Sequence, residues 1–171
     1  RRAAAHLKGR GVKPGDRVLL VLPTGPSFLA AFHGCQVLGA IPVPVYADAV
    51  AEELAFVLAH AETRYAAVED QEQIDKIQSV LDRLPKLELM IYDETRGLRD
   101  YDHAKLRSMD DVIADGRKAL AADPKLGQWL DAEIAAGKGS DPSIMLYTSG
   151  TTGKSKGVML SGERSIKAAS D

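Results

Sequence analysis

The residue types that could do chemistry are concentrated in one stretch near the C-terminal end of the chain. Residues 148–157 contain only Thr, Ser, Gly and Lys, and short apolar runs at 144–147 and 158–160 flank them. The apolar runs predict buried strand ends, whereas a segment without apolar side chains predicts a loop. The sequence therefore predicts a strand–loop–strand unit with a polar, basic loop.

This loop has the chemistry of a phosphate-binding site. Glycine lacks a Cβ atom and lets the backbone approach a ligand closely, and successive backbone N–H groups in such a loop can form a concavity for anions. The hydroxyl groups are hydrogen-bond donors and potential Mg²⁺ ligands. No Asp or Glu occurs between Asp141 and Glu163 to repel a polyphosphate. A flexible linker has a similar composition, but linkers rarely lie between two apolar strand-like runs.

A Walker A loop is the obvious competing interpretation, because Gly153-Lys154-Ser155 matches the end of that motif. The motif requires a glycine five residues before Gly153, where this chain has Thr148. It also requires a helix directly after the loop, whereas residues 157–160 are short and strand-like. Both features argue against a Walker-type nucleotide site.

The segment from Tyr147 to Val158 reads YTSGTTGKSKGV and resembles the signature loop of the AMP-forming, or adenylate-forming, superfamily. This superfamily includes acyl-CoA synthetases, luciferases and peptide-synthetase adenylation domains, and its pattern is YTSGTTGxPKGV. Ser155 departs from the usual proline, which would fix φ and stiffen the end of the loop. Gly162 stands where the family usually has a histidine after the Leu-Ser pair.

Other segments extend the resemblance over nearly the whole chain. Residues 17–25 and 30–46 look like the usual opening of an acyl-CoA synthetase, and residues 68–76 and 96–102 are similar to bacterial long-chain fatty acyl-CoA synthetases. Family members are several times longer. We therefore interpret residues 1–171 as a single partial domain, the N-terminal-side piece of the AMP-binding domain, which ends just after the phosphate loop. Other parts of the site would lie beyond Asp171, and the fragment alone is expected to be inactive.

The resemblance implies a two-step ligase reaction. A fatty carboxylate attacks the α-phosphate of ATP to give an acyl-adenylate and pyrophosphate, and the thiol of coenzyme A then displaces AMP. Because the first step brings an anion to an anion, Mg²⁺, lysine and oriented N–H groups must neutralise charge. Two alternatives remain open: a fatty acyl-AMP ligase that passes the acyl group to a carrier protein, and a non-catalytic nucleotide-binding domain.

The resemblance also implies roles for individual residues. Lys156 matches the lysine of the motif and is expected to pair with phosphate oxygens as a catalytic residue, whereas Lys154 is at a variable position and is expected to be solvated. Thr148 is expected to lie near Mg²⁺ as well as near phosphate. The residues expected to hold the β- and γ-phosphates are Thr148, Ser149, Gly150, Thr151, Thr152 and Gly153.

Composition narrows the class of protein further. A chain of 171 residues with 45% hydrophobic residues can bury a sizeable core in one domain. The net charge of −2 argues against a nucleic-acid partner. A single cysteine suits a reducing compartment, so we expect a cytoplasmic enzyme. Residues 18–47 carry no charged side chain, but Pro and Gly interrupt them before the length of about 20 residues that spans a bilayer. Peripheral membrane contact of the full enzyme remains open.

The rest of the chain alternates strand patterns with helix patterns, which predicts an α/β fold with a mainly parallel sheet and helices on both faces. It would be a fragment of the large N-terminal domain of an adenylate-forming enzyme. Pro42 and Pro44 lack N–H groups on the same side of their strand, which predicts an edge. Strands are predicted at 17–22, 41–46, 64–68 and 87–92. Helices are predicted at 1–10, from Pro26 through Cys35, and at 48–62, 71–84, 108–121 and 123–136.

Several reactive side chains are predicted to be structural. Cys35 recurs with Phe28 and Phe32 on one helical face and reads as a core thiol. Asp100, Asp102 and His103 show no known ligand spacing, and residues 93–107 are predicted to form a solvated loop. Trp129 is expected to pack rather than to stack on a ligand. No role is assigned to the scattered histidines His6, His60 and His103.

Overall fold

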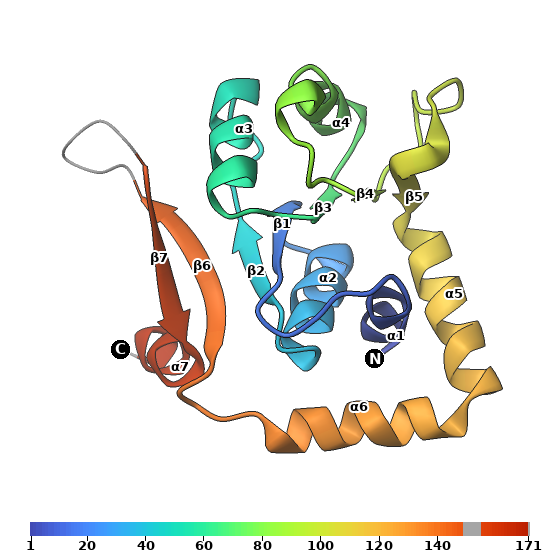
Figure 1. The fold of residues 1–171 in the computed structure, drawn as a ribbon, viewed down its shortest axis with the longest axis vertical. Helices are drawn as coiled ribbons and strands as arrows, with labels where there is room; N and C mark the ends of the chain where they lie inside the picture. The colour runs from blue at the N-terminus through green and yellow to red at the C-terminus, as the bar shows by residue number, and fades with distance from the viewer. Residues whose placement is uncertain (149–154, 171) are drawn as a thin grey trace.

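A computed structural model shows a five-stranded parallel sheet between two layers of helices, with an antiparallel hairpin beside it (Figure 1). It describes residues 1–148 and 155–170, the last three by their backbone alone. The sheet has the order β2-β1-β3-β4-β5 and all its pairings are parallel. Its strands are β1 (Arg17–Val21), β2 (Ile41–Pro44), β3 (Tyr65–Val68), β4 (Leu89–Tyr92) and β5 (Leu106–Ser108). The predicted α/β class is confirmed.

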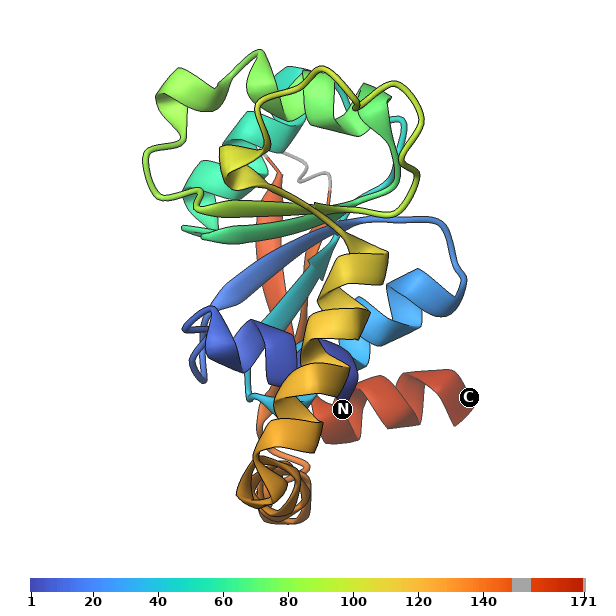
Figure 2. The ribbon, with the colours of Figure 1, turned by 90° about the vertical axis from the view of Figure 1, so that its right-hand side faces the viewer.

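Helices cover both faces of the sheet (Figure 2). One face carries α3 (Ala51–His60) and α4 (Gln71–Gln78), and the other carries the remaining helices of the sheet layer. These are α1 (Arg2–Gly9), α2 (Pro26–Val37), α5 (Met109–Ala122) and α6 (Pro124–Ala136). Within residues 1–148 and 155–170, no helix combines the length and the apolar character needed to cross a bilayer.

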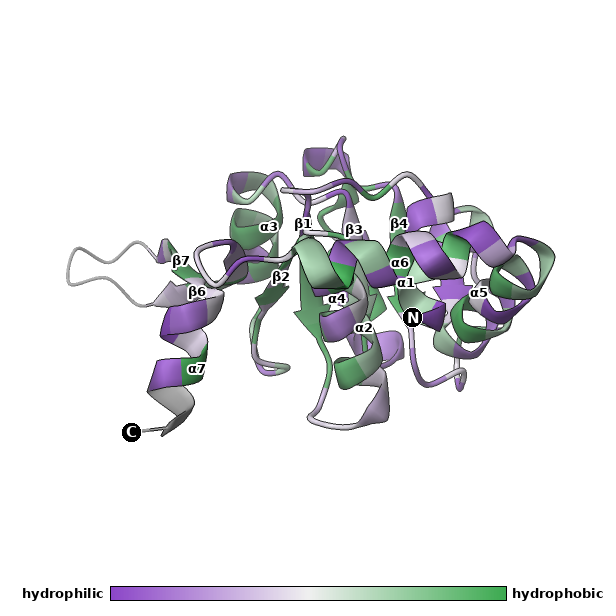
Figure 3. Ribbon diagram, turned by 90° about the horizontal axis from the view of Figure 1, so that it is seen from below, coloured by the Kyte–Doolittle hydropathy of each residue, from purple (hydrophilic) through white to green (hydrophobic). Residues whose placement is uncertain are grey.

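The central strands are apolar throughout because both of their faces are covered. Successive residues of a strand point to opposite faces, and in β1 Leu19 enters the core under α3 and α4, whereas Val18 and Leu20 enter the core under α1 and α2. All three are at most 1% exposed. Figure 3 shows the same distribution, with apolar residues in the strands and polar residues on the outer helix surfaces.

The edge position of β2 follows from its prolines, as predicted. The N–H groups of Ile41 and Val45 donate to carbonyl groups along β1, at 2.7 and 2.9 Å. Pro42 and Pro44 alternate with these residues, so the outer side of β2 has no donors to offer a further strand. The hairpin lies against this side without joining the sheet (Figure 1).

Two predicted helices have wrong boundaries. The helix predicted for 48–62 spans only Ala51–His60, and Val50 precedes it and is 56% exposed. The helix predicted to reach Leu84 ends at Gln78, where the Ser79 hydroxyl donates to the Lys76 carbonyl and competes with the helical pattern. A 3₁₀ turn, η1 (Leu81–Arg83), follows.

The predicted loop 93–107 is wrong at its end, because a 3₁₀ turn, η2 (His103–Lys105), leads into β5. This strand has three residues, and the exposed Arg107 lies between two buried side chains. Such a short alternation gives no strand signal in the sequence. The helix starts that follow it are confirmed, since Ser108 caps α5 through Asp111 N–H and Asp123 caps α6 through Lys125 N–H.

Candidate functional site

The predicted strand–loop–strand unit is a hairpin of β6 (Pro142–Thr148) and β7 (Lys156–Ser161), followed by α7 (Gly162–Ser170). The strands are antiparallel, and at their open end Tyr147 pairs with Gly157 and Thr148 pairs with Lys156. The connecting segment lies outside the described residues. The phosphate-binding roles of Ser149, Gly150, Thr151, Thr152 and Gly153 therefore remain predictions, as does solvation of Lys154.

Thr148 and Lys156 are brought together by this register. Directly opposed residues of an antiparallel pair point to the same face, with Cβ atoms about 5 Å apart, and both residues are exposed. None of the ion pairs among the described residues involves Lys156. The hairpin therefore ends in an exposed hydroxyl beside an ammonium group with no carboxylate partner in this part of the structure.

The opposite face of the hairpin end is anchored by Tyr147. Its hydroxyl oxygen lies 2.7 Å from His60 Nδ1 at the end of α3. The Phe56 ring stacks on His60 at 5.5 Å between centroids and meets Tyr147 edge-on at 6.2 Å. Burial raises the pKa of Tyr147, so its hydroxyl keeps the proton at neutral pH and sustains this hydrogen bond. These contacts hold Tyr147, which directly precedes Thr148, against α3.

Gly157 makes this packing possible. A Cβ atom at this position would overlap the terminal methyl group of Met145 and lie 3.2 Å from Tyr147 Cζ. The absence of a side chain allows Tyr147 to lie across the neighbouring strand. The glycine next to Lys156 thus has a packing role in the described structure.

The base of the hairpin is held by polar contacts that the sequence does not reveal. The side chain of Gln36 in α2 donates to the carbonyl of Ser143 at 3.1 Å. The Ser143 hydroxyl lies 2.9 Å from that of Ser165 in α7, and Gly162 N–H donates to the Asp141 carbonyl at 3.1 Å. These contacts connect β6 to helices on either side of it.

A pocket of about 490 Å³ lies on the Tyr147 side of the hairpin end and reaches Ser155. Phe56 and Tyr46 contribute apolar surface, but the pocket also contains three carboxylates, from Asp48, Glu52 and Glu53. Carboxylates repel phosphate oxygens. The face of Thr148 and Lys156 is therefore better suited to a polyphosphate than this pocket is.

The prediction that both flanking strands are buried is wrong for β7. Val158 is 43% exposed and Met159 is 59% exposed, whereas Met145 of β6 is 8% exposed and joins the core. The reason is the position of β7, which lies outside β6 and away from β2 (Figure 1). Among the described residues, no second layer covers it.

The side chains predicted to be structural make structural contacts. Cys35 is fully buried, and burial raises its pKa to about 12, which leaves it a thiol rather than a nucleophilic thiolate. Asp102 accepts from Ala104 N–H, and His103 Nε2 lies 3.0 Å from the Leu98 carbonyl. Trp129 packs against the core, with Lys8 Nζ 3.4 Å from its ring centroid.

A family model described as "AMP-binding enzyme" matches residues 1–170. The chain belongs to the AMP-binding enzyme family. The resemblance identified in the sequence is therefore confirmed at family level.

Curated relatives cover almost all of this chain. It is 27% identical over 165 residues to long-chain-fatty-acid–CoA ligase FadD15 of Mycobacterium bovis. This alignment covers 94% of the chain and 24% of that protein. It is 32% identical over 163 residues to probable 4-coumarate–CoA ligase 1 of Dictyostelium discoideum. This alignment covers 94% of the chain and 28% of that protein. The chain thus spans about a quarter of the length of these AMP-binding enzymes.

Solved structures have the same fold. The N-terminal domain of FACL13 from Mycobacterium tuberculosis aligns with a TM-score of 0.68 and 28% identity, covering 95% of this chain and 35% of that one. The anthranilate CoA ligase AuaEII aligns with a TM-score of 0.69 at 23% identity, covering 95% of this chain and 28% of that one, and supports the fold alone. The five-stranded sheet and its helices are therefore an arrangement found in both of these solved structures.

Proposed function

We propose that the protein is an AMP-forming acid–thiol ligase that activates a long-chain fatty acid with ATP and passes the acyl group to coenzyme A. The observation that carries the proposal is the pairing of Thr148 with Lys156 at the open end of the hairpin. The segment between them has the composition of an anion-binding loop. Membership in the AMP-binding enzyme family supports the choice of a nucleotide as the anion.

In the first step, a carboxylate oxygen of the acid forms a bond to the α-phosphorus of ATP and the bond to pyrophosphate breaks. Lys156 pairs with phosphate oxygens and offsets the negative charge that develops as the two anions meet. Residues 148–153 hold the β- and γ-phosphates that leave as pyrophosphate. In the second step, the thiol sulfur bonds to the acyl carbon, AMP leaves and the thiol proton is released.

We further propose that Thr148, which is exposed at the end of β6, supplies one hydroxyl oxygen to a Mg²⁺ ion. The described residues contain no group of three or more Asp, Glu, His or Cys side chains that could hold a metal. When bound, Mg²⁺ would neutralise phosphate charge.

The long-chain class of acid rests on the relatives named as long-chain-fatty-acid–CoA ligases, FadD15 and FadD13, at 27% and 29% identity. Relatives named as 4-coumarate–CoA ligases and an acetyl-coenzyme A synthetase have comparable identity. What these names share is the joining of a carboxylic acid to coenzyme A. Beyond this shared reaction, we propose that the acid has a long chain, that the enzyme acts in lipid metabolism and that it is cytoplasmic.

The experiment offers a panel of acids to the protein with its natural ends, with the 171-residue chain in parallel, and measures product formation from ATP and coenzyme A. Hexadecanoate, 4-coumarate and acetate separate the acid classes represented among the relatives. We expect hexadecanoyl-CoA and AMP as products, with hexadecanoate the best substrate. A preference for coumarate or acetate would contradict the long-chain assignment.

The acceptor is tested in the same preparation with an acyl carrier protein in place of coenzyme A. If coenzyme A is present and the product is still acyl-adenylate, while the carrier protein does accept the acyl group, the protein is a fatty acyl-AMP ligase and not a CoA ligase. Nucleotide binding without any acyl-adenylate from the folded protein would favour a non-catalytic domain.

A further inference from the structure

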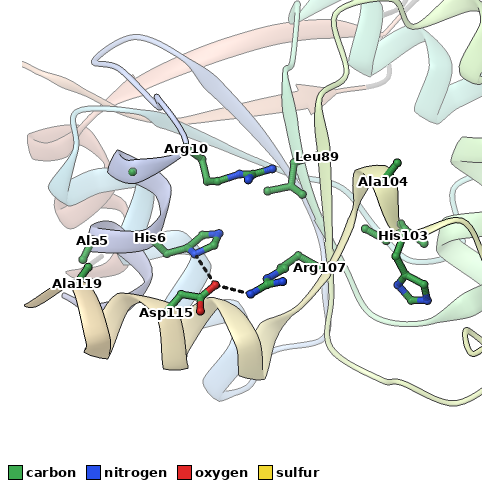
Figure 4. Close-up of a pocket in the computed structure, with 11 residues that line it drawn as sticks. Ala5, His6, Arg10, Leu89, His103, Ala104, Arg107, Asp115 and Ala119 are labelled. Carbon is green, nitrogen blue, oxygen red and sulfur yellow. Dashed lines mark hydrogen bonds and ion pairs between the residues drawn. The ribbon is translucent and has the colours of Figure 1, made fainter.

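A second polar pocket lies at the edge of the sheet farthest from the hairpin. It has a volume of about 470 Å³ and lies between α1, α5 and the first residues of β4 and β5 (Figure 4). Its charged and titratable side chains come from three of these elements. They are His6 and Arg10 from the α1 end, Arg107 from β5 and Asp115 from α5, and His103 lines the outer part.

His6 forms the buried part of this pocket. Its side chain is 7% exposed, and its Nδ1 lies 3.7 Å from Asp115 Oδ2. Its Nε2 is buried and has no hydrogen-bond partner among the described residues. Buried polar atoms in folded proteins are nearly always hydrogen-bonded, and one without a partner points to a missing ligand or water.

Two arginines stand at the mouth of the pocket with only one carboxylate between them. Arg107 pairs with Asp115 at 2.5 Å. No ion pair of the described residues involves Arg10. In Figure 4, the His6 ring and the ends of both arginine side chains point into the same space. The pocket therefore has a net positive charge and an unfilled hydrogen-bonding position at its base.

We propose that this pocket binds the phosphate group of a small phosphorylated molecule, with His6 Nε2, Arg10 and Arg107 as its contacts. A tetrahedral phosphate presents three oxygens, which suits three donors placed at the α1 end and on β5 better than a planar carboxylate does. Arginine recognises phosphate through its fork of N–H groups. The apolar Ala5 and Leu89 leave room for an uncharged body. The site is separate from the signature loop and does not depend on the proposed ligase activity.

Proton uptake is coupled to this binding. Asp115 and Asp111 on α5, Arg107 on β5 and Arg10 at the end of α1 all act on His6, and burial lowers its pKa. The empty pocket thus holds a neutral ring. A bound phosphate favours the imidazolium, whose Nε2–H then donates to it. Phosphate binding should therefore raise the pKa of His6.

Inorganic phosphate is titrated into the ¹⁵N-labelled chain while the side-chain nitrogen signals of the histidines are followed by NMR. This readout is used because phosphate also has the signature loop as a binding place, whereas His6 reports only on its own pocket. We expect saturable shifts at His6, a higher His6 pKa with phosphate, and no shift at His33. No response of His6 to phosphate would overturn the proposal.

Arginine variants provide the matched comparison. Arg10→Met should weaken phosphate binding at His6 by about tenfold or more, because an exposed guanidinium is lost without disturbing the core. Arg117→Met is the control, since Arg117 is exposed on the same helix as Asp115 but does not line the pocket. Equal affinities in R10M and R117M would contradict the assignment, and so would acetate binding as tightly as phosphate.

Glycerol 3-phosphate and vesicles of phosphatidylcholine with phosphatidic acid distinguish a free phosphate ester from a lipid headgroup. We expect glycerol 3-phosphate to shift His6 and to compete with inorganic phosphate. Arg10-dependent flotation with the vesicles, without any His6 response to glycerol 3-phosphate, would overturn the assignment to a small molecule.

Discussion

Among single residues, Tyr147 connects the phosphate loop most directly to the rest of the molecule. Its ring lies on the face of the hairpin opposite Thr148 and Lys156, and its hydroxyl group is 2.7 Å from His60 Nδ1. Because Tyr147 directly precedes Thr148, its packing on α3 determines where the loop leaves β6. The chemistry expected on one face of the hairpin thus depends on an aromatic anchor on the other.

Removing the hydroxyl in Tyr147→Phe should lower the free energy of unfolding by about 1 kcal/mol, since a hydrogen bond is lost while the ring packing stays. Urea unfolding measures this change. Tyr46→Phe is the control, because Tyr46 is 86% exposed. Equal unfolding free energies for Y147F and Y46F would show that the contact with His60 contributes nothing.

Gly157→Ala should destabilise the chain by about 1–3 kcal/mol, because the new methyl group overlaps the end of Met145 and crowds Tyr147. Gly9→Ala is the matched control, since a Cβ atom at Gly9 meets nothing within 4 Å. Denaturant unfolding of both variants tests the packing. If G157A were as stable as G9A, Gly157 would not be needed for the position of Tyr147.

At the scale of secondary-structure elements, local sequence specifies most of the sheet layer. Strands covered on both faces show as continuous apolar runs, and Pro42 and Pro44 identify the edge strand because they remove donors from one side of it. Helix starts at Ser108 and Asp123 follow from their capping side chains. These features depend on residues within a few positions of one another.

Features that depend on tertiary contacts were not predictable in this way. The strand β5 is too short to show a pattern, and β7 is exposed because of where the hairpin packs. In the candidate site, the strand–loop–strand order was predictable, but the contact of His60 with Tyr147 joins residues 87 positions apart. Neither residue carries a local signal for the other.

The cap of α5 gives a prediction at this scale. The Ser108 hydroxyl accepts from Asp111 N–H at 3.1 Å, and Ser108→Ala should cost about 1 kcal/mol of unfolding free energy through the lost cap. Ser79→Ala is the comparison, because the Ser79 hydroxyl donates to a carbonyl of the helix end and does not cap a helix start. Thermal unfolding that gave S108A and S79A the same stability would contradict the capping role.

At the scale of the whole molecule, the two proposed anion sites lie at opposite ends of one sheet. The hairpin with Lys156 lies beside β2, and the pocket with His6 lies beside β4 and β5. The parallel sheet and its two core layers form the rigid separation between them. A ligand at one feature therefore has no direct contact with the other within the described structure.

The free energy of unfolding should depend on pH through His6. Burial lowers the pKa of His6 from 6.5, so the unfolded chain binds a proton more readily than the folded chain does. The contribution of neutral His6 to the free energy of unfolding is complete above pH 6.5. It is lost as the pH falls from 6.5 through the lower pKa that His6 has in the folded chain. Urea unfolding between pH 7.5 and 5 should show this loss, and saturating phosphate should reduce it.

His6→Gln should flatten the slope of stability against pH in this range, because the group whose pKa burial lowers is removed. The carboxylates with lowered pKa values, Glu62, Glu88, Glu94 and Asp115, lose their contribution only at lower pH, as they take up protons. An unchanged slope in H6Q would show that His6 does not cause the pH dependence of the stability.

Acid-dependent exchange of pyrophosphate into ATP, measured for the wild type, Lys156→Ala and Lys154→Ala in the protein with its natural ends, decides most directly whether the hairpin end is an adenylation site. We predict that K156A loses about a hundredfold or more in exchange rate, as expected for removal of a charge-stabilising group, and that K154A stays near the wild type. Equal losses in the two variants, or unchanged exchange in K156A, would contradict the placement of the phosphates on Lys156.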